Sequence, residues 1–320
     1  MKIYFGINHY QCLDQDLYLA LGNFDGVHRG HQRLIGAAAE RASQREGLAG
    51  ALVFDPHPAQ ILTPEHAPQL LVSSAAKAVL LESAGLDVLI YHPFSEEMAQ
   101  LSPQAFVESI LVNSLHVKEV FVGFNYTFGH KGEGNPELLK KLGEMYGFAV
   151  HVIDPVIIDG DLVSSSLIRQ LLGEGNIKRA ALMLGYAPFI EGKVVAGDNR
   201  GGSLLGFPTA NIQVPAYHVV PGNGVYAAYA RLQDEDTQHL CVVNIGQVPT
   251  FHDDNSPVSV EAHILGFDRQ IYGETITLYF LERLRSERRF DSVDDLIIQI
   301  NEDCKQAVEI AARSGDEGFN

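Results

Sequence analysis

The stretch Gly22-Asn23-Phe24-Asp25-Gly26-Val27-His28-Arg29-Gly30-His31 lies between an apolar run at 17–21 and a helical pattern over 31–42. This order predicts a turn that leads from the end of a buried strand into the first turn of a helix. The free N–H groups at a helix N-terminus form a site for phosphate. His28 and His31 are three residues apart, so both can reach the same phosphate from one helical face.

The remainder of the first half alternates strand-like and helical segments. Strands are predicted at 49–54, 88–91, 117–122 and 148–153, and helices near 75–84, 103–112 and 136–146. This alternation predicts an α/β fold, a doubly wound parallel sheet with helices on both faces. Ligands of such sheets bind at the carboxyl ends of the strands.

The second half, after Pro188, is rich in β-segments separated by Gly and Pro. Strands are predicted at 190–196, 224–232, 238–245, 258–265 and 275–280. They indicate a small antiparallel barrel or sandwich, followed by an amphipathic helix over about 293–312 that Asp291-Ser292 can cap. We place the boundary near 185–190, which gives domains 1–186 and 187–320.

Composition limits the classes of function. The chain has 320 residues, 46% of them hydrophobic, and a net charge of −17. This charge opposes a broad nucleic-acid or membrane surface, and no apolar run of 18 residues predicts a membrane span. The three scattered cysteines form no CxxC pair, which argues against a zinc site or a disulfide framework. With no signal-peptide pattern at Met1, we expect a cytoplasmic protein.

Two further segments of the first half carry polar groups where a phosphate could bind. Asn125 follows the strand at 117–122, and Ser164-Ser165-Ser166 opens a helix with Arg169 one turn further on. Transfer of a nucleotidyl group requires the developing phosphate charge to be neutralised, which histidine N–H groups and Mg²⁺ can do. Taken alone, a histidine at this position could equally serve only as a helix cap, and serines usually do.

The second half contains a glycine-rich loop over 197–206 that leads into Gly206-Phe207-Pro208-Thr209-Ala210-Asn211. In an extended segment Thr209 and Asn211 face the same way, as two oxygen ligands for a hard cation. Phosphorylation of an alcohol also needs a base, and Glu261 in Val260-Glu261-Ala262-His263 is the candidate. An isolated glutamate in a strand more often faces solvent.

The segments of the first half, in this order and spacing, resemble the N-terminal module of bacterial bifunctional riboflavin kinase/FAD synthetases, within the HxGH nucleotidyltransferase superfamily. The resemblance implies that His28 and His31 are catalytic and that His57 lies near the nucleotide or the flavin, as a flavin-binding residue. A histidine that only belongs to a proline turn explains His57 as well. The residues that it implies for nucleotide binding are Gly22, Phe24, Asp25, Gly30, Asn125, Ser164, Ser165 and Arg169. Ser166 and Leu167 replace the threonine and the basic residue that are usual in this family.

The second half resembles the riboflavin kinase domain, a six-stranded barrel with a terminal helix. The resemblance implies that Gly201, Gly206, Pro208 and Thr209 bind nucleotide and that Thr209 and Asn211 bind Mg²⁺. It further implies that Glu261 is the base for the ribityl 5′-hydroxyl. Arg285 would lie near the flavin, although a structural salt bridge explains it as well. Gly202 replaces an arginine that many relatives have.

We therefore expect an enzyme that phosphorylates riboflavin to FMN and adenylylates FMN to FAD, with ATP as co-substrate and Mg²⁺ as cofactor. Its partners would be small molecules, with no nucleic acid or membrane, and the sequence allows weak self-association. A monofunctional adenylyltransferase and a non-catalytic flavin sensor are the alternatives. The acid–base and metal residues argue against both.

Overall fold

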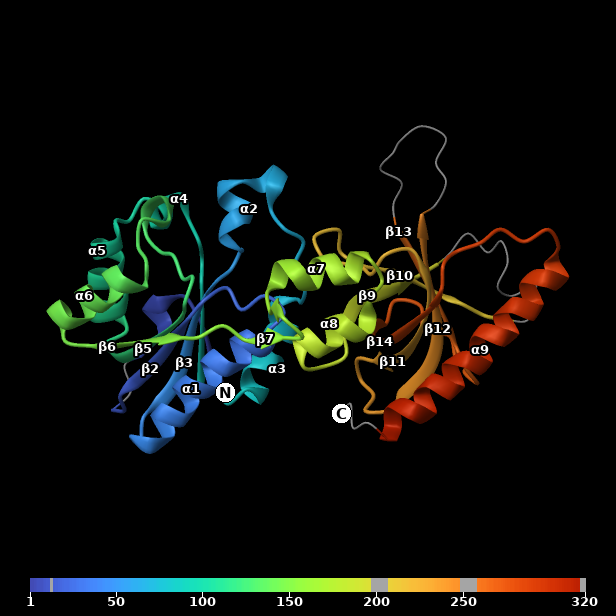
Figure 1. Ribbon diagram of the computed structural model, residues 1–320, viewed down its shortest axis with the longest axis horizontal. Helices are drawn as coiled ribbons and strands as arrows, with labels where there is room; N and C mark the ends of the chain where they lie inside the picture. Colours follow the sequence, from blue (N-terminus) through green and yellow to red (C-terminus); the bar gives the residue numbers. More distant parts are fainter. Residues whose placement is uncertain (12–13, 197–206, 248–257, 317–320) are drawn as a thin grey trace. The chain divides into compact units, whose positions relative to one another are not determined.

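The computed structural model describes residues 1–11, 14–196, 207–247 and 258–316. Contacts along the chain divide it into two compact units, Met1–Ser165 and Ser166–Asn320. The first contains a parallel sheet with flanking helices and the second contains a closed barrel (Figure 1). The division lies before residue 186, so the predicted boundary between the functional domains stays a prediction.

The sheet of the first unit has six parallel strands. They are β1 (Lys2–Phe5), β2 (Leu17–Leu21), β3 (Leu48–Phe54), β4 (Val88–His92), β5 (Val117–Gly123) and β6 (Ala149–Ile153). Their order is β1-β4-β3-β2-β5-β6, and every pairing is parallel. The order reverses between β2 and β5, which is where ligands bind in doubly wound sheets. A short ribbon of β7 (Ile157–Ile158) and β8 (Asp161–Leu162) follows.

The central strand β2 is buried on both faces, as the apolar run at 17–21 predicts. Leu17, Leu19 and Leu21 belong to one core, beneath α5 (Pro103–Phe106), a π-helix η3 (Val107–Ser114) and α6 (Pro136–Tyr146). Tyr18 and Ala20 belong to the other, beneath α1 (Arg29–Gln44) and α3 (Ser74–Ser83). Two short helices, α2 (Pro58–Leu62) and α4 (Glu96–Ala99), follow β3 and β4.

The second unit begins with α7 (Ser165–Gly173) and α8 (Ile177–Leu184). Its strands are β9 (Phe189–Val195), β10 (Ala210–Gln213), β11 (Gly224–Leu232), β12 (Gln238–Gln247), β13 (Val258–Ile264) and β14 (Thr275–Arg285). They close an antiparallel barrel in the order β10-β13-β12-β11-β14-β9. The fold class is therefore confirmed in both halves.

The terminal helix α9 (Val293–Asp316) packs on the outside of the barrel. Ala307 and Ile310 of α9 form a core with Val225 and Val242 of the strands. The N–H of Asp295 donates to Ser292 Oγ at 3.1 Å, so the predicted helix cap is confirmed. α9 therefore covers the barrel face that carries Val225 and Val242.

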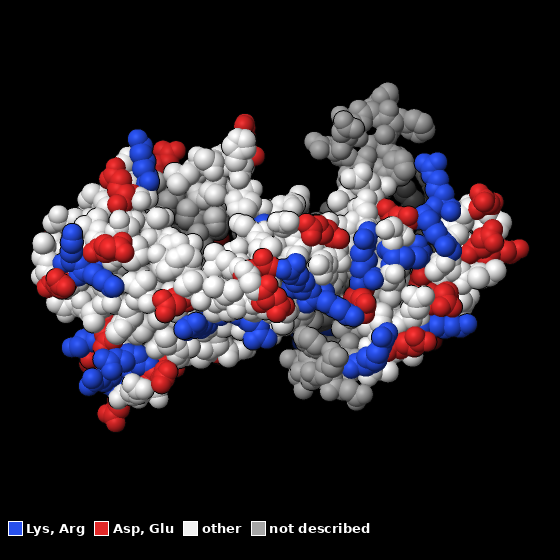
Figure 2. Space-filling model, viewed as in Figure 1, with Lys and Arg blue, Asp and Glu red and all other residues white. Residues whose placement is uncertain are grey.

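Acidic and basic side chains are mixed over the surface that faces the viewer in Figure 2, despite the net charge of −17. Lys and Arg do not gather there into one continuous basic area. Among the helices of the described residues, none combines the length and the apolar character that a membrane crossing requires.

An ion-pair cluster joins α1, β5 and β6 on the first unit. Arg41 donates to both carboxylate oxygens of Glu119 at 2.9–3.1 Å, and His151 Nε2 lies 2.6 Å from the same carboxylate. Burial alone would raise the pKa of Glu119, but its hydrogen bonds with Arg41 and His151 outweigh burial and lower it. The folded state therefore favours the ionised carboxylate.

We expect this cluster to make thermal stability depend on acid pH. A depressed pKa adds stability above the ordinary glutamate pKa of about 4.3, and this contribution disappears as the pH falls through the lower pKa of the folded state. Thermal unfolding between pH 7 and pH 3 should therefore show a steeper fall in Tm for the parent protein than for Glu119→Gln. Parallel curves would contradict this role.

Candidate active sites

The turn between β2 and α1 has an unusual backbone. Phe24, Gly26 and Val27 have φ values of 48°, 77° and 34°. Phe24 and Val27 are fully buried, and neither a bulky nor a β-branched side chain favours the left-handed region. Such conformations cost about 1–3 kcal/mol each and persist only where surrounding contacts hold them. The turn is therefore a strained segment that depends on its neighbours.

Three side-chain contacts hold this turn. The buried carboxylate of Asp25 accepts hydrogen bonds from the N–H of Leu71 at 3.0 and 3.2 Å. Ser165 Oγ donates to the carbonyl of Asp25 at 2.9 Å, and Lys77 Nζ donates to the carbonyl of Asn23 at 2.9 Å. Asp25 and Ser165 thus shape the turn, and the nucleotide-binding roles predicted for them stay predictions.

His28 and His31 stand together at the start of α1. Their rings stack with centroids 3.7 Å apart and planes 16° apart. His28 also caps the helix, because its Nδ1 accepts from the N–H of His31 at 3.3 Å. A neutral His28 therefore carries its proton at Nε2, which makes that nitrogen a donor. One histidine is therefore a helix cap, and this contact fixes the tautomer of its neutral ring. Its role in phosphate binding stays a prediction.

His31 is held in an apolar environment. Its Nδ1 is buried and has no hydrogen-bond partner among the described residues, and Phe24 packs edge-on against the ring at 5.2 Å. Burial lowers the pKa of His31 well below its usual value, and the nearby His28 and Lys77 lower it further. His31 is therefore neutral at physiological pH, so the pair does not repel itself.

The two glycines predicted in this site leave room for its rings. A Cβ on Gly30 would lie 3.1 Å from Cε1 of His28, and one on Gly22 would lie 3.1 Å from Cζ of Phe24. Either added methyl group would press on the histidine pair or on the ring that packs against it. Their nucleotide contacts stay predictions.

Two of the other predicted residues of the first site, Asn125 and His57, follow strands β5 and β3 of the sheet. Asn125 is exposed in the turn after β5, across the point where the strand order reverses. His57 caps α2 by accepting from the N–H of Ala59 at 3.2 Å, and its Nε2 lies 3.2 Å from the amide of Asn23. Ser164 directly precedes α7. Arg169 belongs to the second unit, so its part in this site stays a prediction.

The second site is a row of residues across four strands of the barrel. Glu261 on β13 pairs directly with Asn211 on β10 and with Asn244 on β12, and Asn244 pairs in turn with Val225 on β11. Direct cross-strand partners point to the same face of a sheet. Val225 packs with α9, so this row lies on the outer face of the barrel. The strand register thereby brings the predicted base beside a predicted metal ligand.

Contacts fix both segments of this row. Ser259 Oγ donates to Glu261 Oε1 at 3.2 Å. The Nδ1 of His263 donates to the carbonyl of Pro208 at 2.8 Å. The rings of His263 and Phe207 pack edge to face, with their centroids 5.4 Å apart. The loop that carries Thr209 is thus tied to the strand of the base. Gly201 and Gly206 lie outside the described residues.

Asn211, a predicted metal ligand, is the cross-strand partner of Glu261, and amide and carboxylate oxygens suit a hard cation such as Mg²⁺. The metal-binding roles predicted for Thr209 and Asn211 stay predictions. The described residues contain no group of three or more His, Cys, Asp or Glu side chains that could hold a metal. A cation here would accordingly take its remaining ligands from nucleotide phosphates and water, as Mg²⁺ commonly does.

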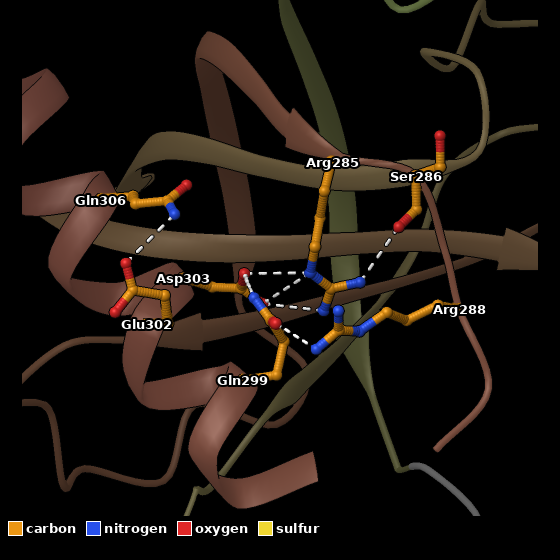
Figure 3. Close-up of polar contacts among 7 residues, drawn as sticks. All are labelled: Arg285, Ser286, Arg288, Gln299, Glu302, Asp303 and Gln306. Carbon is orange, nitrogen blue, oxygen red and sulfur yellow. Dashed lines mark hydrogen bonds and ion pairs between the residues drawn. The ribbon is translucent and has the colours of Figure 1, made fainter. Parts of the chain in front are cut away.

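Arg285 lies in a polar network beneath α9 (Figure 3). Its guanidinium donates to both oxygens of Asp303 at 2.8–3.1 Å, and Gln299 donates to the same carboxylate at 2.7 Å. The Asp303 side chain is only 2% exposed. The salt bridge considered for Arg285 is therefore present. A contact with flavin stays a prediction.

Replacement of Asp303 by alanine is expected to lower the free energy of unfolding by about 3–5 kcal/mol, because Arg285 would be left without its buried counter-charge. Denaturant unfolding of the full chain measures this change. Glu302→Ala, one residue away on the exposed side of α9, is the control and should have little effect. Equal effects of the two substitutions would contradict the role of the ion pair.

Sequence reasoning missed several residues in these sites. Lys77 lies in a helical pattern between Ala76 and Ala78, and a lysine among small apolar residues was the available signal. Asn244 and Ser259 gave no signal of their own. Their place beside Glu261 depends on the register between strands, which one sequence does not show.

Comparison with known proteins finds a family match for each half of the chain. The FAD synthetase family model matches residues 11–167, and the riboflavin kinase family model matches residues 184–311. The bifunctional riboflavin kinase/FMN adenylyltransferase of Listeria monocytogenes is 39% identical over 91% of each chain. The Haemophilus influenzae protein of the same name is 33% identical over 96% of this chain and 98% of its own.

A crystal structure described as a macrolide-efflux protein from Streptococcus pneumoniae has the same fold, with a TM-score of 0.85 and 30% identity. The match covers 95% of this chain and 97% of that one, and the activity in that description is stated for that protein alone. Two family models match in succession, and the relatives named for both activities align over nine-tenths or more of their length. The chain therefore belongs to the family of bifunctional riboflavin kinases/FMN adenylyltransferases, the enzymes that form FMN from riboflavin and FAD from FMN.

Proposed function

We propose that the two reactions take place at the two sites described above, FAD formation at the turn between β2 and α1 and FMN formation at the Asn211–Glu261 row. ATP is the co-substrate of both. The observation that carries the proposal is the stacked, tautomer-fixed pair of His28 and His31 at a helix N-terminus, at the point where the strand order reverses.

In the adenylyl transfer, a phosphate oxygen of FMN attacks the α-phosphorus of ATP and pyrophosphate leaves. No covalent intermediate with the protein is needed. The reaction requires that charge on the phosphates be neutralised as it develops, and this falls to the Nε2–H of His28, to His31 and to the N–H groups at the start of α1. Asn125, Ser164 and Arg169 bind the remaining phosphate and nucleotide groups, and His57 lies toward the flavin.

In the kinase reaction, the ribityl 5′-hydroxyl oxygen attacks the γ-phosphorus of ATP, the bond to the β-phosphate oxygen breaks, and ADP leaves. Glu261 accepts the hydroxyl proton, and Ser259 keeps its carboxylate in place. Thr209 and Asn211 would hold Mg²⁺, which neutralises phosphate charge when bound. Pro208, Gly201 and Gly206 contact the nucleotide, and Arg285 stands toward the flavin.

The experiment is product analysis by chromatography, with riboflavin and FMN supplied separately together with ATP and Mg²⁺. We expect riboflavin to yield FMN and then FAD, and FMN to yield FAD. Omission of Mg²⁺ with a chelator present should suppress both steps. Failure to form either product would contradict the proposal. We also propose a cytoplasmic location and weak self-association. Sedimentation at several concentrations tests the self-association.

A further inference from the structure

Lys77 is a buried lysine that neither reaction described above uses. It lies one turn into α3 and is 6% exposed. Its Nζ donates to the carbonyl of Asn23 at 2.9 Å, the only partner that the structure gives it among the described residues. Burial of a charged group destabilises the folded state unless a hydrogen bond or an opposite charge compensates for the lost hydration. The position of this lysine therefore calls for an explanation in the turn that it contacts.

The carbonyl that Lys77 binds precedes the strained part of the turn. Phe24, the next residue, has a φ of 48°, and Val27 has a φ of 34° just before His28. The Asn23 side chain in turn meets His57 Nε2 at 3.2 Å. One lysine thus holds a segment with a catalytic histidine on one side and the predicted flavin contact on the other.

The charge on Lys77 has counterparts around it. Burial lowers the pKa of Lys77, while the carboxylates of Asp25 and Asp55 oppose this shift and favour the ammonium form. Asp55 is itself fixed by the hydroxyl of Ser74 at 2.7 Å, and Ser73 caps the same helix through the N–H of Ala76 at 3.1 Å. The start of α3 is thus anchored to the strand ends that carry the site.

We infer that Lys77 is a positioning residue for adenylyl transfer: through the carbonyl of Asn23 it holds the strained turn in the conformation that sets the His28–His31 pair. Because the lysine is buried behind the turn, it acts on the reaction through the turn and not by contact with substrate. The inference rests on the function proposed for this site.

The test compares Lys77→Met, which is one atom shorter and has neither donor nor charge, with Lys77→Gln, which is as long as methionine and keeps a donor. For Lys77→Met we expect the kcat of FAD formation to fall by about 100-fold, as for small displacements of catalytic groups, with the KM for FMN unchanged. Lys77→Gln should lie between this variant and the parent. Lys118→Met, which removes an exposed lysine of the same unit, is the control and should match the parent.

A parent-like kcat in Lys77→Met would overturn the inference, and so would equal losses in the Met and Gln variants or a rise in KM alone. If Lys77→Met does not fold, as judged by circular dichroism, Lys77→Gln decides: it must fold and show the fall in kcat. If the parent itself makes no FAD from FMN, the proposed function fails instead, which separates the two cases.

Discussion

Replacement of His28 by alanine is expected to lower the rate of FAD formation from FMN by about 100- to 1,000-fold, the usual cost of one lost donor to developing charge. The substitution removes the Nε2–H donor and the stacking partner of His31. It also removes the cap on α1, which costs about 1 kcal/mol of stability, too little to unfold a domain of ordinary stability. Initial rates of FAD formation at saturating FMN and ATP measure the effect.

Formation of FMN from riboflavin should be unchanged in the same variant, because the barrel residues belong to the other compact unit. His66→Ala, an exposed histidine of the first unit, is the matched control and should retain both activities. If His28→Ala made FAD at the parent rate, the stacked pair would have no part in the chemistry.

Replacement of Glu261 by glutamine is expected to lower FMN formation by about 100- to 10,000-fold, the range for loss of a general base. Glutamine keeps the size of the side chain and an oxygen for the Ser259 hydroxyl, so the strand pairing with Asn211 and Asn244 should persist. The lost property is the capacity to accept the 5′-hydroxyl proton. Initial rates with riboflavin and ATP measure the change.

FAD formation from supplied FMN should remain at the parent rate in Glu261→Gln. Glu309→Gln, on the exposed side of α9, provides the control for an arbitrary glutamate of the same unit. If Glu261→Gln kept normal kinase activity, Glu261 would not be the base, and it would be an ordinary solvent-facing glutamate in a strand.

Much of the fold follows from local patterns in both units. The predicted helix at 136–146 and the predicted strand at 224–232 have the same bounds as α6 and β11. The helix predicted over 103–112 is instead a short α-helix followed by a π-helix. Apolar spacing alone does not separate these forms, because it reports which side is buried and not how the backbone hydrogen bonds run.

The elements that were missed lack a pattern of their own. β1 is an edge strand of four residues, none of them fully buried, and its apolar run, Ile3 to Phe5, has only three residues. β10 has four residues directly after the glycine-rich loop, and its place in the barrel comes from its pairing with β9 and β13. α8 was not predicted because it has only eight residues between Gly175 and Gly185, although its buried face is apolar.

In the sites too, contacts within one short motif could be predicted and contacts between distant segments could not. His28, His31 and Gly30 are consecutive in a motif, so their proximity was predictable from helical spacing. The anchoring of this motif by Asp25, Ser165 and Lys77 was not, because each contact joins segments between 46 and 140 residues apart. The same holds for Glu261, whose neighbours Asn211 and Asn244 come from other strands.

The central claim, two reactions at two separate sites of one chain, is tested most directly by supplying riboflavin and FMN separately to His28→Ala and to Glu261→Gln. With ATP and Mg²⁺ present, His28→Ala should convert riboflavin to FMN and leave FMN without conversion to FAD. Glu261→Gln should convert FMN to FAD and leave riboflavin unchanged. Loss of both activities in either folded variant would contradict the account.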